Sequence, residues 1–271
     1  MSDRYAVIGH PVDHSKSPLI HAAFARQAGQ DLVYGRLLAP LDDFAGSARR
    51  FFAEGGAGLN VTVPFKHEAW QLVDTREGGA EAAGAVNTIR REGPRLIGHN
   101  TDGPGLVADL ERNLGVAIGG RRVLLMGAGG AARGVLLPLL ERAPSALVIV
   151  NRTPDRAEML ARQFGGPGLP LRGSGYAALA GEQFDLVINA TSASLAGALP
   201  PLPDTLFASG AFAYDMMYGR ETPFIAFARA RGVAFADGLG MLVEQAAESF
   251  LIWRGVRPLT APVIARLRAG D

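Results

Sequence analysis

The sequence predicts an α/β protein of two domains, each organised around an open and mostly parallel β-sheet. Its 271 residues suffice for two domains of ordinary size. Short apolar runs of strand length alternate with helical patterns through most of the chain, as they do in proteins built from βα units. A glycine-rich turn, Gly127 to Gly130, separates one of these strands from the helix that follows it.

Composition excludes several classes of protein and site. Apolar residues make up 48% of the chain and charged residues 20%, which is typical of a globular protein. The net charge of +1 gives no reason to expect nucleic acid or an anionic membrane as a partner. The absence of cysteine excludes disulfides, zinc–thiolate sites, iron–sulfur clusters and thiol nucleophiles. Since no apolar run resembles a signal peptide or approaches the roughly 20 residues of a membrane span, we expect a cytoplasmic protein.

The first predicted domain covers residues 1–102. Its strand and helix patterns alternate from the first strand onward. Pro18 suits the first turn of a helix, and Ser17 is the expected N-cap of that helix. The expected strands are 5–9, 32–38, 58–63, 85–91 and 95–98, and the expected helices are 18–28, 44–52, 66–73 and 79–83.

The second predicted domain covers residues 103–237 and repeats βα units, as a Rossmann-type sheet does. Residues 238–271 are expected to form two helices that pack back across both domains and return to the first. Composition predicts loops at 166–175 and 200–203. The expected strands are 123–126, 146–150, 184–189, 210–216 and 233–236, and the expected helices are 102–114, 154–164, 224–230, 238–253 and 260–269.

The glycine-rich turn is typical of a site that holds a dinucleotide pyrophosphate. The start of the following helix leaves backbone N–H groups unpaired and carries partial positive charge. Gly127 would make the tight turn, Gly129 would let the backbone approach the pyrophosphate, and Ala132 is small enough for helix-on-strand packing. A flexible turn without a ligand is the alternative, but the position between a strand and a helix favours a nucleotide.

The next strand indicates which dinucleotide is bound. In a site for NAD an acid usually ends this strand, whereas here the strand ends in Asn151, Arg152 and Thr153. A guanidinium pairs with a 2′-phosphate that a carboxylate would repel. Arg152 and Arg156 therefore favour NADP, although a solvated helix start would also use arginines.

Polar side chains collect at the ends of elements in the first domain. Ser15 and Ser17 flank Lys16 just beyond the first strand, where a helix-capping motif would use the same residues. Asn60 and Thr62 alternate with valines, which places them on one face at the end of a strand. Ligands bind at this edge of open α/β sheets.

Lys66 and Asp102 are candidates for proton transfer. Lys66 opens a helix, where the dipole disfavours positive charge, so it is either a functional lysine or an ordinary surface one. Asp102 begins another helix and could serve simply as its N-cap. Together with Asn87 and the hydroxyl side chains, the pair suits a small polyhydroxylated acid better than an apolar ligand.

Taken in order, these motifs resemble those of the shikimate dehydrogenase family over essentially the whole chain. This family reduces 3-dehydroshikimate to shikimate with NADPH, in the biosynthesis of chorismate and the aromatic amino acids. The matching segments are HSKSP (14–18), NVTVPFK (60–66), GAVNT (84–88), NTDG (100–103), GAGGAARG (127–134), NRT (151–153), NATSASL (189–195), YDMMY (214–218) and GMLVEQAAESF (240–250).

The resemblance implies a role for individual residues. Lys66 would be the catalytic acid/base, with Asp102 beside it, and no metal is expected. The implied substrate-binding residues are Ser15, Ser17, Asn60, Thr62, Lys66, Asn87, Asp102, Tyr218 and Gln245. The implied NADP-binding residues are Gly127, Ala128, Gly129, Gly130, Ala131, Asn151, Arg152, Thr153, Arg156, Met216 and Gly238. The family also has an acidic cofactor residue shortly before GAVNT, where this chain has Gly78 beside Glu77, so no contact is assigned there.

Three alternatives stay open from the sequence. A quinate/shikimate dehydrogenase would use NAD, which the strand end at Asn151 to Thr153 disfavours. A shikimate-dehydrogenase-like paralogue would vary in the substrate loops, whereas Ser15, Ser17 and Lys66 are intact. A non-catalytic NADP-binding regulator would be indicated by loss of Lys66 or Asp102, and both are present. We expect a monomer or a homodimer.

Overall fold

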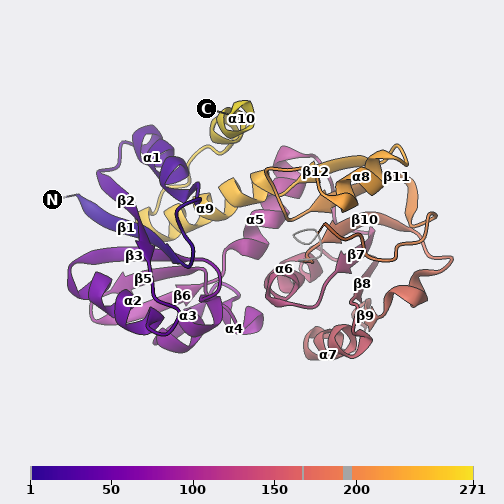
Figure 1. Ribbon diagram of the computed structural model, residues 1–271, viewed down its shortest axis with the longest axis horizontal. Coiled ribbons are helices and arrows are strands. Elements are labelled where there is room, and N and C mark those ends of the chain that lie inside the picture. Colours follow the sequence, from indigo (N-terminus) through magenta and orange to yellow (C-terminus); the bar gives the residue numbers. More distant parts are fainter. Residues whose placement is uncertain (1, 167, 192–196, 271) are drawn as a thin grey trace. The chain divides into compact units, whose positions relative to one another are not determined.

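The computed structural model describes residues 2–166, 168–191 and 197–270, and its chain divides into two compact units (Figure 1). Unit 1 consists of Met1–Gly105 and Leu242–Asp271, and unit 2 consists of Leu106–Met241. The division cuts helices α5 (Asp102–Ala108) and α9 (Leu239–Arg254), whose starts lie beside the domain boundaries predicted after residues 102 and 237. In the part of the chain that the structure describes, no helix combines the length and the hydropathy of a membrane span.

The sheet of unit 1 has six strands in the order β2-β1-β3-β5-β6-β4. Three neighbouring pairs are parallel, whereas β5 is antiparallel to both of its neighbours and forms a hairpin with β6 around Gly93. The sheet is therefore mostly parallel, as predicted. The strands are β1 (Asp3–Gly9), β2 (Leu32–Leu38), β3 (Gly56–Val61), β4 (Thr75–Glu77), β5 (Thr88–Glu92) and β6 (Arg95–His99).

Helices cover both faces of this sheet (Figure 1). On one face, α2 (Phe44–Ala53) and α3 (Lys66–Leu72) share a buried cluster with β1 and β3. On the other, Phe24 of α1 (Ser17–Ala28) packs with Phe250 of α9 and Val263 of α10 (Ala261–Ala269). The short helix α4 (Ala80–Ala83) precedes β5. Within unit 1 the C-terminal helices thus pack against the first helix of the chain.

Unit 2 contains a fully parallel sheet in the order β12-β11-β10-β7-β8-β9. Counted along the chain and read from β9, this is the Rossmann strand order 3-2-1-4-5-6. Its strands are β7 (Arg122–Met126), β8 (Ala146–Val150), β9 (Leu171–Ser174), β10 (Phe184–Asn189), β11 (Phe207–Asp215) and β12 (Ala234–Asp237). Its helices include the end of α5, a π-helical turn (Asp109–Asn113), α6 (Gly130–Leu140), α7 (Pro154–Phe164), a 3₁₀ turn (Tyr176–Leu179) and α8 (Pro223–Arg229).

Two local predictions are wrong for identifiable reasons. The loop expected at 166–175 contains strand β9, in which Gly173 is required for packing, since a Cβ there would lie 2.2 Å from the backbone of Ala157 in α7. Ser17 is not the N-cap of α1: Lys16 occupies that position, and the Ser15 hydroxyl accepts the Ser17 N–H at 3.3 Å. A residue lying one position inside a helix no longer has a side chain placed to accept from the free N–H groups.

Candidate active site

Lys66 and Asp102 form a direct ion pair in unit 1. Lys66 is the first residue of α3, and its Nζ donates to Oδ2 of Asp102 at 2.6 Å. The side chains are 32% and 16% exposed, so both groups reach solvent or a ligand while the pair is partly shielded from water. The expectation of Asp102 as an N-cap is wrong: it is the first helical residue of α5, and its second oxygen accepts from Nδ2 of Asn87 at 2.9 Å.

Asn87 connects this pair to the buried interior. Its side-chain oxygen accepts the backbone N–H of Thr101 at 2.9 Å, and its Nδ2 lies 3.0 Å from Thr101 Oγ1 as well as close to Asp102. Asn87 is only 2% exposed. Because both ends of its amide are held, Asn87 fixes the carboxylate of Asp102, and Asp102 in turn holds the ammonium of Lys66.

A second buried amide, Asn60, lies at the end of β3. Its Oδ1 accepts from the hydroxyl of Tyr34 at 2.7 Å, and its Nδ2 lies 2.9 Å from Ser249 Oγ and 3.1 Å from Thr88 Oγ1. Burial raises the pKa of Tyr34 well above its ordinary value, so the phenol stays a proton donor at neutral pH. His21 stacks on the Tyr34 ring with centroids 4.2 Å apart, and burial lowers its pKa to about 3.

The remaining predicted residues of unit 1 lie at the same sheet edge. Ser15 follows β1, and Thr62 follows β3, which pairs with β1 in parallel; a Cβ on Gly9 at the end of β1 would lie 2.4 Å from Thr62 Cγ2. Gln245 of α9 accepts from Thr101 Oγ1 at 3.4 Å, and its Nε2 donates to the carbonyl of Leu242 at 2.8 Å. The glycine at 105 allows α5 to approach α9, because a Cβ there would lie 2.7 Å from Gln245 Cβ.

Four buried hydroxyl groups in this network were not among the predicted site residues: Tyr34, Thr88, Thr101 and Ser249. Thr88, Thr101 and Ser249 stand inside matched motifs, so their position in the sequence was a usable indication. Tyr34 lies in the middle of β2, where its pattern indicates only a strand.

In unit 2 the glycine-rich turn adopts the geometry that its residues predicted. Gly127 has φ 109° and a Cβ there would lie 3.0 Å from the carbonyl of Ala190. A Cβ on Gly129 or Gly130 would meet no heavy atom of the described residues within 4 Å, so packing inside the chain does not require these glycines. Both are exposed at the start of α6, whereas Ala132 is fully buried. The open backbone at a helix N-terminus fits a phosphate-bearing ligand.

The end of β8, beside β7 in the sheet, carries exposed cationic side chains. Arg152 and Arg156 are exposed, and within the described ranges no carboxylate lies within ion-pair distance of either. The side-chain amide of Asn151 donates to the carbonyl of Thr153 at 3.0 Å and shapes this turn. Two free guanidinium groups at this place fit the 2′-phosphate of NADP.

A third segment of unit 2, Met216 to Tyr218, is held by the buried carboxylate of Asp215. This carboxylate accepts from Nδ2 of Asn189 and from the N–H of Met217, both at 3.0 Å. A Cβ on Gly238 would lie 2.3 Å from the carbonyl of Met216, so only glycine fits there. Burial raises the pKa of the Tyr218 hydroxyl. Residues 192–195 of the NATSASL motif lie outside the described residues.

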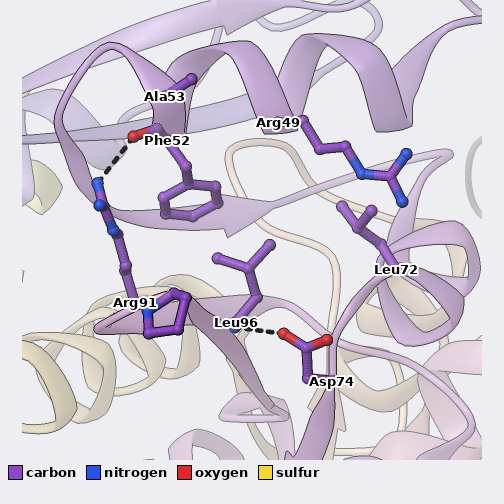
Figure 2. Close-up of a pocket in the computed structure, with 8 residues that line it drawn as sticks. Arg49, Phe52, Ala53, Leu72, Asp74, Arg91 and Leu96 are labelled. Carbon is purple, nitrogen blue, oxygen red and sulfur yellow. Dashed lines mark hydrogen bonds between the residues drawn. The ribbon is translucent and has the colours of Figure 1, made fainter.

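A separate cavity of about 340 Å³ in unit 1 is lined by other residues than the predicted site (Figure 2). Two of its polar side chains hold the backbone in place: Arg91 donates to the carbonyl of Phe52 at 2.8 Å, and Asp74 accepts the N–H of Leu96 at 2.8 Å. In the residues that the structure describes, no group of three or more His, Cys, Asp or Glu side chains could hold a metal ion.

Comparison with known proteins gives the family. Successive parts of the chain match the models of the shikimate dehydrogenase substrate binding domain (residues 7–89), shikimate/quinate 5-dehydrogenase (110–196) and the shikimate 5′-dehydrogenase C-terminal domain (238–268). The chain is 62% identical over 270 residues to the shikimate dehydrogenase (NADP(+)) of Alkalilimnicola ehrlichii, covering 99% of both sequences. This chain belongs to the shikimate dehydrogenase family. The predicted resemblance is thereby confirmed.

Solved structures agree with this assignment. An Ael1 enzyme from Pseudomonas putida is 51% identical, with a TM-score of 0.94 and 98% of each chain covered. The shikimate 5-dehydrogenase of Thermus thermophilus, solved with NADP(H) and shikimate, is 34% identical, with a TM-score of 0.87 and coverage of 99% and 100%. The predicted two-domain α/β fold with a Rossmann-type sheet is therefore that of shikimate dehydrogenases.

Proposed function

We propose that this chain catalyses the reversible, NADP-dependent interconversion of shikimate and 3-dehydroshikimate, with Lys66 as the acid/base and Asp102 as its partner. The observation that carries the proposal is the 2.6 Å ion pair between these two residues at the ligand-binding edge of the unit 1 sheet. Unit 1 supplies the proton-transfer groups and most substrate-binding groups, and unit 2 supplies the NADP site. The cytoplasmic location and the oligomeric state, monomer or homodimer, stay predictions.

Lys66 suits proton transfer because it is a lysine in a chain whose other cationic side chains are nearly all arginines. Of the 27 lysine and arginine residues, two are lysines, Lys16 and Lys66. A guanidinium does not release its proton in a protein, whereas an ammonium can. A chain that uses arginine for nearly all of its cations retains lysine at the position where the reaction needs a transferable proton.

NADPH, when bound, supplies the hydride that reduces the ketone. Lys66 donates a proton from Nζ to the oxygen on which negative charge develops, and takes it back in the oxidation of shikimate. Asp102 keeps the ammonium oriented, and Asn87 keeps Asp102 in place through its 2.9 Å hydrogen bond. General acid catalysis of this kind typically contributes roughly 10²–10⁴-fold to the rate.

Binding of the substrate and of the cofactor uses different chemistry. Hydroxyl donors at Ser15 and Ser17 would bind the ring carboxylate, and the other substrate-binding residues are Asn60, Thr62, Asn87, Asp102, Tyr218 and Gln245. The turn from Gly127 to Ala131 would hold the pyrophosphate, with Asn151, Thr153, Met216 and Gly238 as further contacts. Arg152 and Arg156 would pair with the 2′-phosphate and so select NADP over NAD.

The decisive experiment measures initial rates by the absorbance of the reduced nicotinamide with four pairs: shikimate or quinate, each with NADP⁺ or NAD⁺. We expect the highest kcat/KM with shikimate and NADP⁺. Quinate and NAD⁺ as the best pair would support the quinate dehydrogenase alternative. NADP⁺ binding without turnover of either substrate would support a non-catalytic regulator.

A further inference from the structure

Ser249 lies at the centre of the hydrogen bonds that connect the proposed substrate-binding residues of unit 1. It belongs to α9 and is fully buried. Its Oγ lies 2.9 Å from Nδ2 of Asn60, 2.8 Å from Oγ1 of Thr88 and 3.0 Å from the backbone carbonyl oxygen of Gln245. One hydroxyl therefore joins β3, the start of β5 and the helix that carries Gln245.

The balance of donors and acceptors determines what Ser249 does to Asn60. The Asn60 amide nitrogen can only donate, so Ser249 Oγ accepts from it, and the single hydroxyl proton of Ser249 serves either the Gln245 carbonyl at 3.0 Å or Thr88 Oγ1 at 2.8 Å. Thr88 Oγ1 at 3.1 Å and the backbone carbonyl of Asn87 at 3.2 Å are further acceptors, and on the opposite side Oδ1 accepts from Tyr34. Both N–H donors of the amide thus face the interior of unit 1.

We propose that Ser249 is a positioning residue for substrate recognition: it fixes the orientation of the Asn60 amide, so that Asn60 can offer a substrate only the free lone pair of Oδ1. Such a group accepts from a hydroxyl and repels a carbonyl oxygen, which makes it selective for a hydroxylated ring. The inference rests on the proposed function of Asn60 as a substrate-binding residue. Without the Ser249 hydroxyl, the Asn60 amide loses its shortest acceptor and keeps only the longer ones, Thr88 Oγ1 at 3.1 Å and the Asn87 carbonyl at 3.2 Å, so its orientation is less firmly held.

The test compares S249A with S47A in the full chain. Ser47 is a matched control, since it is a buried serine of the same unit that lies in α2, away from this network. We expect S249A to raise the KM for shikimate about fivefold or more, as loss of a buried hydrogen-bond partner does, while the KM for NADP⁺ changes less than about twofold. S47A should leave both constants unchanged. A purely structural role would lower the melting temperature of S249A and leave the KM for shikimate at its wild-type value, which would overturn the proposal.

A double-mutant cycle with N60A separates positioning from independent effects. If Ser249 acts through Asn60, adding S249A to N60A changes kcat/KM for shikimate less than about twofold; full multiplication of the two effects would contradict the proposal. Should S249A not fold, S249C keeps a similar side-chain shape while offering only a weak acceptor to Asn60, and it carries the same expectation. A wild-type chain that does not turn over shikimate would instead overturn the proposed function.

Discussion

Substitution of His21 by phenylalanine should flatten the pH dependence of stability below neutral pH. His21 is fully buried, and burial lowers the pKa of its imidazole from 6.5 to about 3. In the unfolded chain the imidazole of His21 therefore becomes protonated near pH 6.5, whereas in the folded chain it stays neutral until the pH falls toward 3. The stability that neutral His21 contributes is complete above pH 6.5 and is lost as the pH falls from there. At about pH 5 the loss amounts to roughly 2 kcal/mol, since each pH unit costs about 1.4 kcal/mol.

Urea unfolding at about pH 7.5 and pH 5, followed by tryptophan fluorescence, measures this effect. Both tryptophans, Trp70 and Trp253, lie in unit 1, so their emission reports the unit that contains His21. Phenylalanine keeps an aromatic ring against Tyr34, so H21F should lose roughly 2 kcal/mol less than the wild type between the two pH values. The control is H14N at an exposed histidine, which should behave like the wild type. Equal losses in H21F and the wild type would refute the reasoning.

Three further substitutions test the site. D102N keeps the shape but removes the charge, so kcat should fall about 10- to 100-fold, as expected for loss of a charge-assisted hydrogen bond; an unchanged kcat would remove Asp102 from the mechanism. R152A should raise the KM for NADPH by about tenfold or more and that for NADH little, with R162A farther along α7 as the control, and equal weakening of both cofactors would contradict the 2′-phosphate assignment. G238A would force its Cβ to within 2.3 Å of the carbonyl of Met216, so the KM for NADP⁺ should rise, whereas wild-type kinetics would show that the segment adjusts freely.

The conformation of the glycine-rich turn could be predicted from the sequence, because there the local chemistry determines the local structure. Gly127 follows an apolar strand and has a positive φ, as the tight turn requires, and Ala132 is buried against the sheet. Strand β9 could not be predicted, because a contact with the preceding helix, α7, determines its structure. Gly173 resembled a loop residue, yet its missing side chain makes room for α7 beside β9.

In the candidate site, too, some residues could be predicted from the sequence and others could not. The motifs identified Lys66 and Asp102, and the structure pairs them although 36 residues separate them. The supporting contacts could not be derived from spacing, because Ser249 meets Asn60 across 189 residues and Tyr34 meets it across 26. A hydroxyl on a strand or a helix has no local pattern that identifies its partner, so these contacts require the three-dimensional fold.

Whether Lys66 transfers a proton is tested most directly by the kcat of K66R with shikimate and NADP⁺. Arginine keeps the positive charge beside Asp102 and cannot exchange the proton. We expect kcat to fall roughly 10²–10⁴-fold with a KM for shikimate within a few-fold of the wild-type value, and K66M to show a loss at least as large. A K66R enzyme with a kcat near that of the wild type would show that position 66 contributes only charge, and would contradict the assignment of Lys66 as the acid/base.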